Sequence, residues 1–157
     1  MAGRVYRLPF NAQSLSTSKQ DLWAITTTSA SMGFLEEVRL DPCATSISEF
    51  SLSLSLFTGS YTAGSGGAAL TPAKTIPGDA AATVTCKTQN TTQTAVGSGT
   101  KTVLDAGQWN LANGWAWQPL DPDHRILVPI SACLVVSLDS TPSSQTVSGC
   151  AIFREVF

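Results

Sequence analysis

Charged side chains are scarce in this sequence. Asp, Glu, Lys and Arg make up only 13% of the 157 residues, about half the usual share. The stretch from Phe50 to Ala73 contains none of them. A free monomer with so little charge is poorly protected against association. We therefore expect much of its surface to be covered by partners.

Clustered cations and long apolar segments are also missing. The formal net charge is −2, and no run of Lys or Arg occurs. Nucleic-acid binding and attraction to anionic lipids both need clustered cations, so we expect neither partner. The longest nearly apolar stretch, residues 126–136, is too short to cross a bilayer. Residues 1–10 lack the apolar segment of a secretory signal, so we expect a protein made in the cytoplasm.

The four cysteines do not form a metal-binding pattern. Cys43, Cys86, Cys133 and Cys150 include no C-x-x-C pair, and structural zinc sites are usually built from such pairs. Three disulfide pairings remain open, but without a secretory signal we expect reduced, buried thiols. No metal or other cofactor is expected.

Alternating apolar and polar residues predict β-strands. Phe50, Leu52, Leu54 and Leu56 alternate with serines, which indicates a strand buried on one face. The chain also has 19 Ser and 19 Thr, and Thr suits a pleated, half-buried surface. No segment combines the start, stripe and stop signals of a helix. Further strands are predicted over residues 4–8, 21–28, 32–40, 81–87, 109–118, 125–130, 132–138 and 146–156.

These strands predict a single all-β domain spanning residues 1–157. Eight or nine strands separated by Gly, Pro and Ser turns favour an antiparallel β-sandwich. Residues 58–82 are predicted to form one long Gly- and Pro-rich loop, which favours a jelly-roll-like arrangement. Loops of this length are often functional, and we expect this one and the two termini to reach neighbouring molecules. A second polar loop is predicted over residues 90–100, and a tight turn at Asn113-Gly114.

No catalytic constellation is recognisable, and we do not expect an enzyme. His124 is the only histidine, and we expect its neighbours Asp121 and Asp123 to point to solvent or to cap their own turn. No serine stands in a nucleophile-elbow pattern. Glu36 and Glu37 are adjacent on a predicted strand and so should face opposite sides, and nothing brings Asp105 or Asp139 near them.

Aromatic residues are the candidates for contact with other molecules. Trp115 and Trp117 lie two residues apart, so on a strand they share one face. Large aromatics of this kind usually fill a core or an interface, and the alternative is stacking on sugar rings. The candidate interface or binding residues are Tyr6, Phe10, Tyr61, Trp109, Trp115, Trp117 and Phe157.

Several segments together resemble a family of structural proteins of tailed bacteriophages. They are Arg4-Val5-Tyr6, Phe10-Asn11-Ala12, Gln20-Asp21-Leu22-Trp23, the loop Gly64 to Gly67 with Thr71-Pro72, Pro77-Gly78-Asp79-Ala80-Ala81, Asn90-Thr91-Thr92, Trp109-Asn110, Gly114-Trp115 and Val147-Ser148-Gly149. The resemblance spans most of the chain and rests on general sequence texture.

The resemblance implies a capsid decoration, or cement, protein. Such a protein would lie on the capsid surface of the virion, bind the major capsid protein and stabilise the head by bridging neighbouring capsomers. The family also implies a jelly-roll-like domain that forms homo-oligomers, often trimers, without catalytic residues. Two alternatives are a virion-borne carbohydrate-binding module that uses Trp109, Trp115 and Trp117, and a tail or connector component.

Overall fold

The computed structural model describes residues 3–15, 18–41, 49–140 and 145–156. These residues form an all-β fold in which every strand pair is antiparallel, which confirms the predicted class. One turn of 3-10 helix, η1 (Pro122–His124), is the only helix among them. The strands are β1 (Gly3–Ser14), β2 (Gln20–Thr26), β3 (Met32–Leu40), β4 (Glu49–Thr58), β5 (Tyr61–Thr62), β6 (Ala68–Leu70), β7 (Ala73–Lys74), β8 (Thr85–Asn90), β9 (Ala95–Val96), β10 (Thr100–Asn110), β11 (Trp115–Trp117), β12 (Ile126–Val128), β13 (Cys133–Leu138) and β14 (Thr146–Val156).

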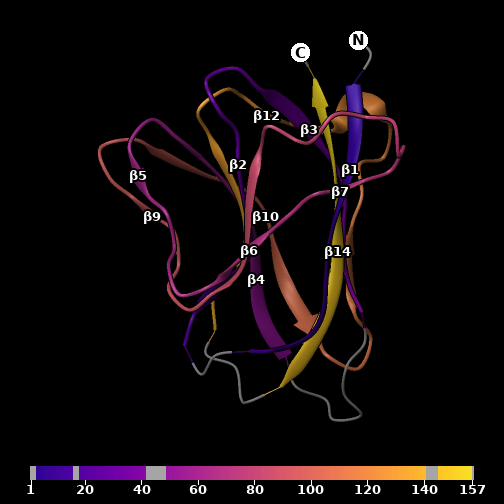
Figure 1. The fold of residues 1–157 in the computed structure, drawn as a ribbon. Helices are drawn as coiled ribbons and strands as arrows, with labels where there is room; N and C mark the ends of the chain where they lie inside the picture. The colour runs from indigo at the N-terminus through magenta and orange to yellow at the C-terminus, as the bar shows by residue number, and fades with distance from the viewer. Residues whose placement is uncertain (1–2, 16–17, 42–48, 141–144, 157) are drawn as a thin grey trace.

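Two six-stranded sheets face each other. Sheet A has the order β11-β3-β14-β1-β7, with β12 also paired to β3, and sheet B has the order β10-β4-β13-β2-β8-β6. Strands β5 and β9 form a separate two-stranded ribbon. Figure 1 shows β1, β7 and β14 of sheet A on the right, β2, β4, β6 and β10 of sheet B in the middle, and the ribbon on the left.

The long strands pair from the outside of the sequence inward. β1 pairs with β14, β2 with β13, β3 with β11 and β12, and β4 with β10. Successive strands therefore alternate between sheets until β4, and the chain returns by the same route after β10. This order brings the two ends of the chain together, with Gly3 opposite Val156, as Figure 1 shows.

The apolar side chains of both sheets meet in one core. It includes Leu8 and Leu35 from sheet A with Trp23 and Leu54 from sheet B. The Trp23 indole N–H donates to the Leu8 carbonyl at 2.9 Å, which joins the two sheets by a buried hydrogen bond. Full burial of one Leu side chain contributes about 1.5–3 kcal/mol. The many buried apolar side chains therefore make this core the main source of stability.

Strand β4 is buried on both faces, whereas its sequence predicts burial on one. Ser53 and Ser55 point away from the core, yet they are 5% and 0% exposed. The chain between β4 and β10 covers this side of sheet B, where Ala24, Phe57, Cys133 and Val135 form a second buried cluster that Tyr61 packs against. The prediction was wrong because the cover comes from distant residues.

The segment predicted as one long loop, residues 58–82, instead contains three short strands. β6 pairs with β8, and β7 pairs with β1. Its end is held by two buried side chains of sheet A: the Tyr6 hydroxyl donates to the Ala80 carbonyl at 3.0 Å, and Glu155 accepts the Val84 N–H at 3.0 Å. Most of this segment is therefore fixed to its own molecule.

Two further boundaries differ from the sequence predictions. β10 begins at Thr100, where a loop was expected, and is 11 residues long. The turn at Asn113-Gly114 forms, with a bridge from Asn110 to Gly114, but it joins β10 of sheet B to β11 of sheet A. β1 continues past Pro9. At Pro9 it pairs with β14 on one side only, because β7 pairs only with Tyr6 and Arg7, and proline is tolerated where one side of a strand is free.

Candidate interaction face

Three of the candidate aromatic residues are enclosed in the fold. Tyr6 and Trp109 are fully buried, and Phe10 is 7% exposed and packs on Trp23 with ring centroids 4.6 Å apart. A surface contact by these side chains does not fit the structure. Phe157 lies outside the described residues.

The other candidate aromatics are half-buried. Tyr61 packs against Phe57 on the ribbon side of sheet B. Trp115 and Trp117 pack against the main core from β11. Trp115 also lines a shallow hollow of about 300 Å³, together with Arg39, Asp41 and Asn113. The sequence did not indicate that these three polar residues meet beside a tryptophan.

The outer face of sheet A, which points away from sheet B, carries most of the arginines. Arg7, Arg39 and Arg154 lie on it in β1, β3 and β14, and Arg125 joins it just before β12. The fifth arginine, Arg4, lies on the other side of β1. Half-buried apolar residues share this outer face, namely Val5, Phe34 and Ile152.

A β-bulge in β3 places two carboxylates on this outer face. Glu37 lies opposite Ile152 and Leu35 lies opposite Phe153, so Glu36 is the extra residue. A bulge sets two residues against one on the partner strand and turns both toward one side. The expectation that Glu36 and Glu37 face opposite sides was therefore wrong, because it assumed unbroken alternation.

Glu36 joins two arginines of this face. Its Oε1 atom accepts from Arg154 Nε at 2.5 Å and from Arg125 Nη1 at 3.1 Å. These three side chains are 21–33% exposed, so water screens their charges less than it screens exposed pairs. The guanidinium carbon of Arg125 also lies 5.8 Å from the centre of the Phe34 ring, a favourable cation–π distance.

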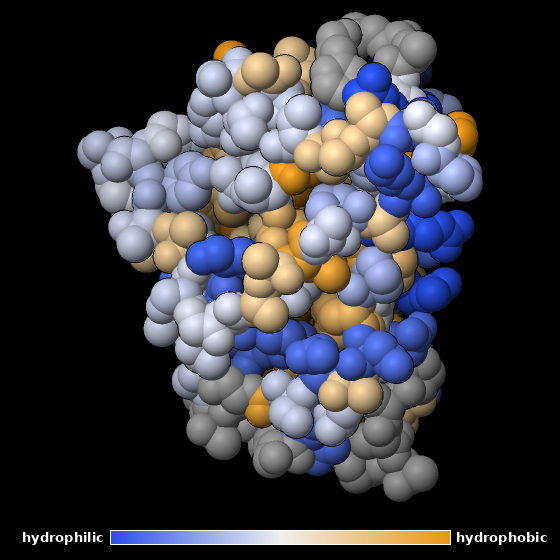
Figure 2. All heavy atoms as spheres, viewed as in Figure 1, coloured by the Kyte–Doolittle hydropathy of each residue, from blue (hydrophilic) through white to orange (hydrophobic). Residues whose placement is uncertain are grey.

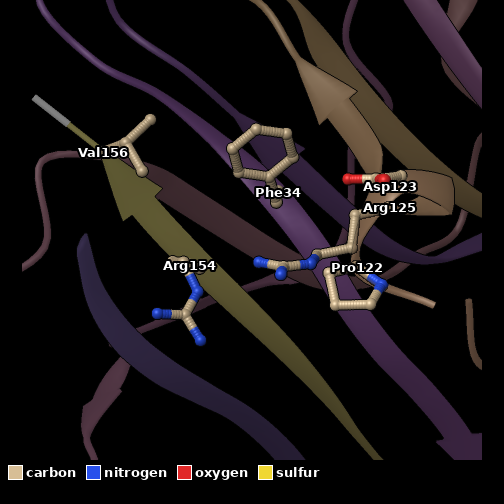
Figure 3. Close-up of a pocket in the computed structure, with 6 residues that line it drawn as sticks. All are labelled: Phe34, Pro122, Asp123, Arg125, Arg154 and Val156. Atoms are coloured by element: carbon tan, nitrogen blue, oxygen red, sulfur yellow. The ribbon is translucent and has the colours of Figure 1, made fainter. Parts of the chain in front are cut away.

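A hollow of about 360 Å³ opens beside this network. Phe34, Pro122, Asp123, Arg125, Arg154 and Val156 line it. Figure 3 shows the Arg125 side chain reaching past Phe34 toward Arg154, with the Asp123 carboxylate at the opposite end. Each guanidinium has five N–H donors, so donors remain beyond those that bind Glu36. The hollow therefore suits a carboxylate or carbonyl group of another molecule.

Strand β10 offers a different kind of surface. It is the last strand of sheet B on its side, and all residues from Thr100 to Gln108 are exposed. Val103 and Leu104 are 55% and 39% exposed although both are apolar. An exposed edge strand presents unpaired N–H and C=O groups that can pair with another strand.

Two aspartates have clear roles in the fold. Asp121 caps η1 as predicted, accepting the Asp123 N–H at 2.8 Å, and its pKa is lowered chiefly by the bond to the His124 side chain. His124 is itself well exposed. Asp21 is fully buried, and burial raises its pKa. The described part of the chain contains no group of three His, Cys, Asp or Glu residues placed to hold a metal ion.

No protein family matches the chain, and neither curated proteins nor solved structures show significant similarity to it. Among the described residues, no helix has the length and hydrophobicity that a membrane span requires.

Proposed function

We propose that this protein is a structural component of a phage particle that binds the outside of the capsid and stabilises the head by bridging neighbouring capsomers. The major capsid protein is its partner, and the outer face of sheet A makes the contact. The particle is stabilised by linkage, because a protein that binds only the assembled capsid shifts the equilibrium toward assembly.

The composition of the outer face of sheet A carries this proposal. Arginine and aromatic residues are enriched in protein interfaces, and lysine is depleted. This face combines Arg7, Arg39, Arg125 and Arg154 with Phe34, whereas the four lysines lie elsewhere, at positions 19, 74, 87 and 101. Figure 2 shows hydrophilic residues along its right margin, the side on which sheet A lies in Figure 1.

The strand order supports the same proposal. The first strand pairs with the last, the second with the second to last, and so on inward, and β5 to β9 lie between β4 and β10. This order is the one expected of a jelly roll. Jelly rolls are common in viral capsid and lectin domains. Fold alone does not define function, so the interface composition carries more weight.

The test uses particles that lack this protein. We expect them to release DNA at a lower temperature than complete particles, and added purified protein to restore the release temperature. Arg154→Ala protein should restore it less well, because it loses donors on the contact face. Lys87→Ala is the matched control, since it removes an exposed cation from sheet B.

Two outcomes would refute the proposal. Equal release temperatures with and without the protein would exclude a stabilising role. Equal restoration by the Arg154→Ala and wild-type proteins would exclude the outer face of sheet A as the contact. The copy number per particle separates a lattice position, with hundreds of copies, from a vertex, tail or connector position with a handful.

Sugar recognition is a second candidate function, favoured by the hollow at Trp115. A tryptophan ring beside an amide, a carboxylate and a guanidinium matches the groups that stack on and hydrogen-bond to a sugar, and Asn113, Asp41 and Arg39 supply the last three. A glycan array with the purified protein tests this function. Binding that Trp115→Ala abolishes would support it, and an array without signal would exclude it.

A further inference from the structure

The free edge of β10 has a symmetry that the sequence does not reveal. β10 pairs with β4 over its whole length, and Leu104 is an extra, bulged residue between Val103 and Asp105. A strand normally alternates its side chains between two faces without interruption. The bulge interrupts the alternation in the middle of β10. As a result, the side chains before and after the bulge follow matching patterns of outward and inward positions.

Before the bulge, the outward side chains are Lys101 and Val103. They lie opposite Phe57 and Ser55, which point away from the core, and the Lys101 ammonium lies 5.5 Å from the centre of the Phe57 ring. Thr102 points inward, because it lies opposite Leu56, which packs against the core.

After the bulge, the outward side chains are Ala106 and Gln108. They lie opposite Ser53 and Ser51, and the Gln108 amide donates to the Ser51 hydroxyl at 3.2 Å. Gly107 lies inward, opposite Leu52. From Val103 back to Lys101, and from Ala106 on to Gln108, the outward and inward positions therefore follow the same order on the two sides of the Leu104–Asp105 bond.

This symmetry selects one register for pairing with an identical strand. Antiparallel pairing reverses direction, so the faces of two β10 strands agree along their length when a twofold axis passes through the Leu104–Asp105 bond. A slip by one residue would set outward side chains opposite inward ones. In the matching register Val103 of one copy lies opposite Ala106 of the other, and Lys101 lies opposite Gln108.

The side chains also suit this register. Val103 and Ala106 are both exposed and apolar, so two copies of each would meet on the outward side and leave water together. Lys101 lies opposite an uncharged residue, and like charges directly opposite each other are the pairs that destabilise a sheet. The closed twofold contact pairs the free edge of β10 in both copies at once.

We propose that β10 pairs with β10 of a second copy of this chain, antiparallel and about a twofold axis between Leu104 and Asp105. The inference rests on the proposed assembly role and names one of its contacts. It differs from the trimer that the family resemblance implies, because an isologous contact joins two copies.

The experiment measures the mass of the purified full-length protein by light scattering over a range of concentrations. We expect a species of twice the single-chain mass of 16.4 kDa. The double variant Val103→Lys/Ala106→Lys places like charges opposite each other across the twofold axis, and we expect a monomer. The double variant Val103→Glu/Ala106→Lys places opposite charges there, and we expect the dimer to remain.

Both positions are exposed in the monomer, so both variants should keep the circular dichroism spectrum and thermal midpoint of the wild type. A wild-type monomer or trimer at all concentrations would overturn the inference, as would a dimer that the two-lysine variant leaves intact. A dimer that is absent from phage particles would instead refute the proposed function alone. Stabilised particles that contain only monomers or trimers would refute this inference alone.

Discussion

Asp21 and Thr94 are joined by two hydrogen bonds to a single carboxylate oxygen. The Thr94 backbone N–H donates to Asp21 Oδ2 at 2.8 Å, and the Thr94 hydroxyl donates to the same atom at 2.7 Å. The Ser137 hydroxyl donates to Oδ1 at 3.0 Å. Asp21 belongs to sheet B, and Thr94 lies directly before β9. This buried carboxylate therefore fastens the β5–β9 ribbon to the sheet that it covers.

Removal of this carboxylate should loosen the ribbon. Asp21→Ala leaves the buried Thr94 N–H without its acceptor, and a lost partner of this kind costs about 1–3 kcal/mol. Urea unfolding measures the loss, and hydrogen exchange should show faster exchange in residues 91–97. Glu49→Ala is the control, because Glu49 is an exposed carboxylate of the same sheet. Equal stability of the two variants would contradict this role of Asp21.

Ionisation of Asp21 should make the stability of the protein depend on pH. Burial raises the pKa of Asp21 in the folded protein, and the bonds from Thr94 and Ser137 oppose this effect only in part. The folded state then holds the proton more tightly than the unfolded state, whose Asp pKa is about 3.9. The resulting stabilisation is fully present below that value and is lost as the pH rises through the folded pKa.

Asp21→Asn isolates this effect, because the amide does not titrate. The unfolding free energy of the wild type minus that of Asp21→Asn should decrease as the pH rises from about 4 toward neutrality. Urea titrations of both proteins at several pH values in this range measure the difference. An increase with pH would show that the folded protein prefers the ionised form, contrary to the structure.

Two glycines of the segment between β4 and β8 should respond differently to alanine. A Cβ atom on Gly64 would lie 2.4 Å from the Thr92 carbonyl oxygen and 2.7 Å from Asp21 Oδ2, whereas a Cβ atom on Gly78 would meet nothing within 4 Å. Gly64→Ala should therefore destabilise the protein by about 1–3 kcal/mol, and Gly78→Ala should change stability by less than about 0.5 kcal/mol. Thermal unfolding compares the two, and equal midpoints would argue against the close packing at Gly64.

Local alternation was enough to predict the inner faces of the long strands. Phe50, Leu52 and Leu54 lie in the core as the sequence indicates. Every second side chain of a strand faces the same side, so the alternation of apolar and polar residues was enough to identify the core-facing ones. Burial of Ser53 and Ser55 could not be predicted in this way. It depends on a cover formed by residues far away in the chain, and no local pattern reports that cover.

In the candidate site, too, the features that depend on distant parts of the chain could not be predicted from local sequence. Aromatic residues were the natural interface candidates, but Trp109 is fully buried whereas Trp115, six residues later, is half-buried. The network of Glu36, Arg125 and Arg154 depends on a bulge and on pairing between three strands. A single arginine in each of several strands gives no sequence signal until the sheet brings them together.

The tryptophans should separate into structural and accessible residues. Trp109 is fully buried beside Phe50, so Trp109→Ala should cost about 3–5 kcal/mol of unfolding free energy. Trp115 is only half-buried, and Trp115→Ala should cost about 1–2 kcal/mol. Urea unfolding followed by circular dichroism measures both losses. A larger loss for Trp115→Ala than for Trp109→Ala would contradict the packing described above.

The cysteines should differ in their reactivity toward a thiol reagent in the native protein. Cys86 and Cys133 are buried, and burial raises the pKa of both thiols, that of Cys133 to about 11. Only the thiolate reacts, so at pH 8 these two should react slowly, whereas the half-exposed Cys150 should react quickly. Cys150→Ser should therefore lower the number of fast-reacting thiols by one, and Cys86→Ser should leave it unchanged. In urea without reductant we expect all four thiols to react, although Cys43 lies outside the described residues. A lower number would reveal a disulfide, and a disulfide between any two of Cys86, Cys133 and Cys150 would contradict the free thiols of the structure.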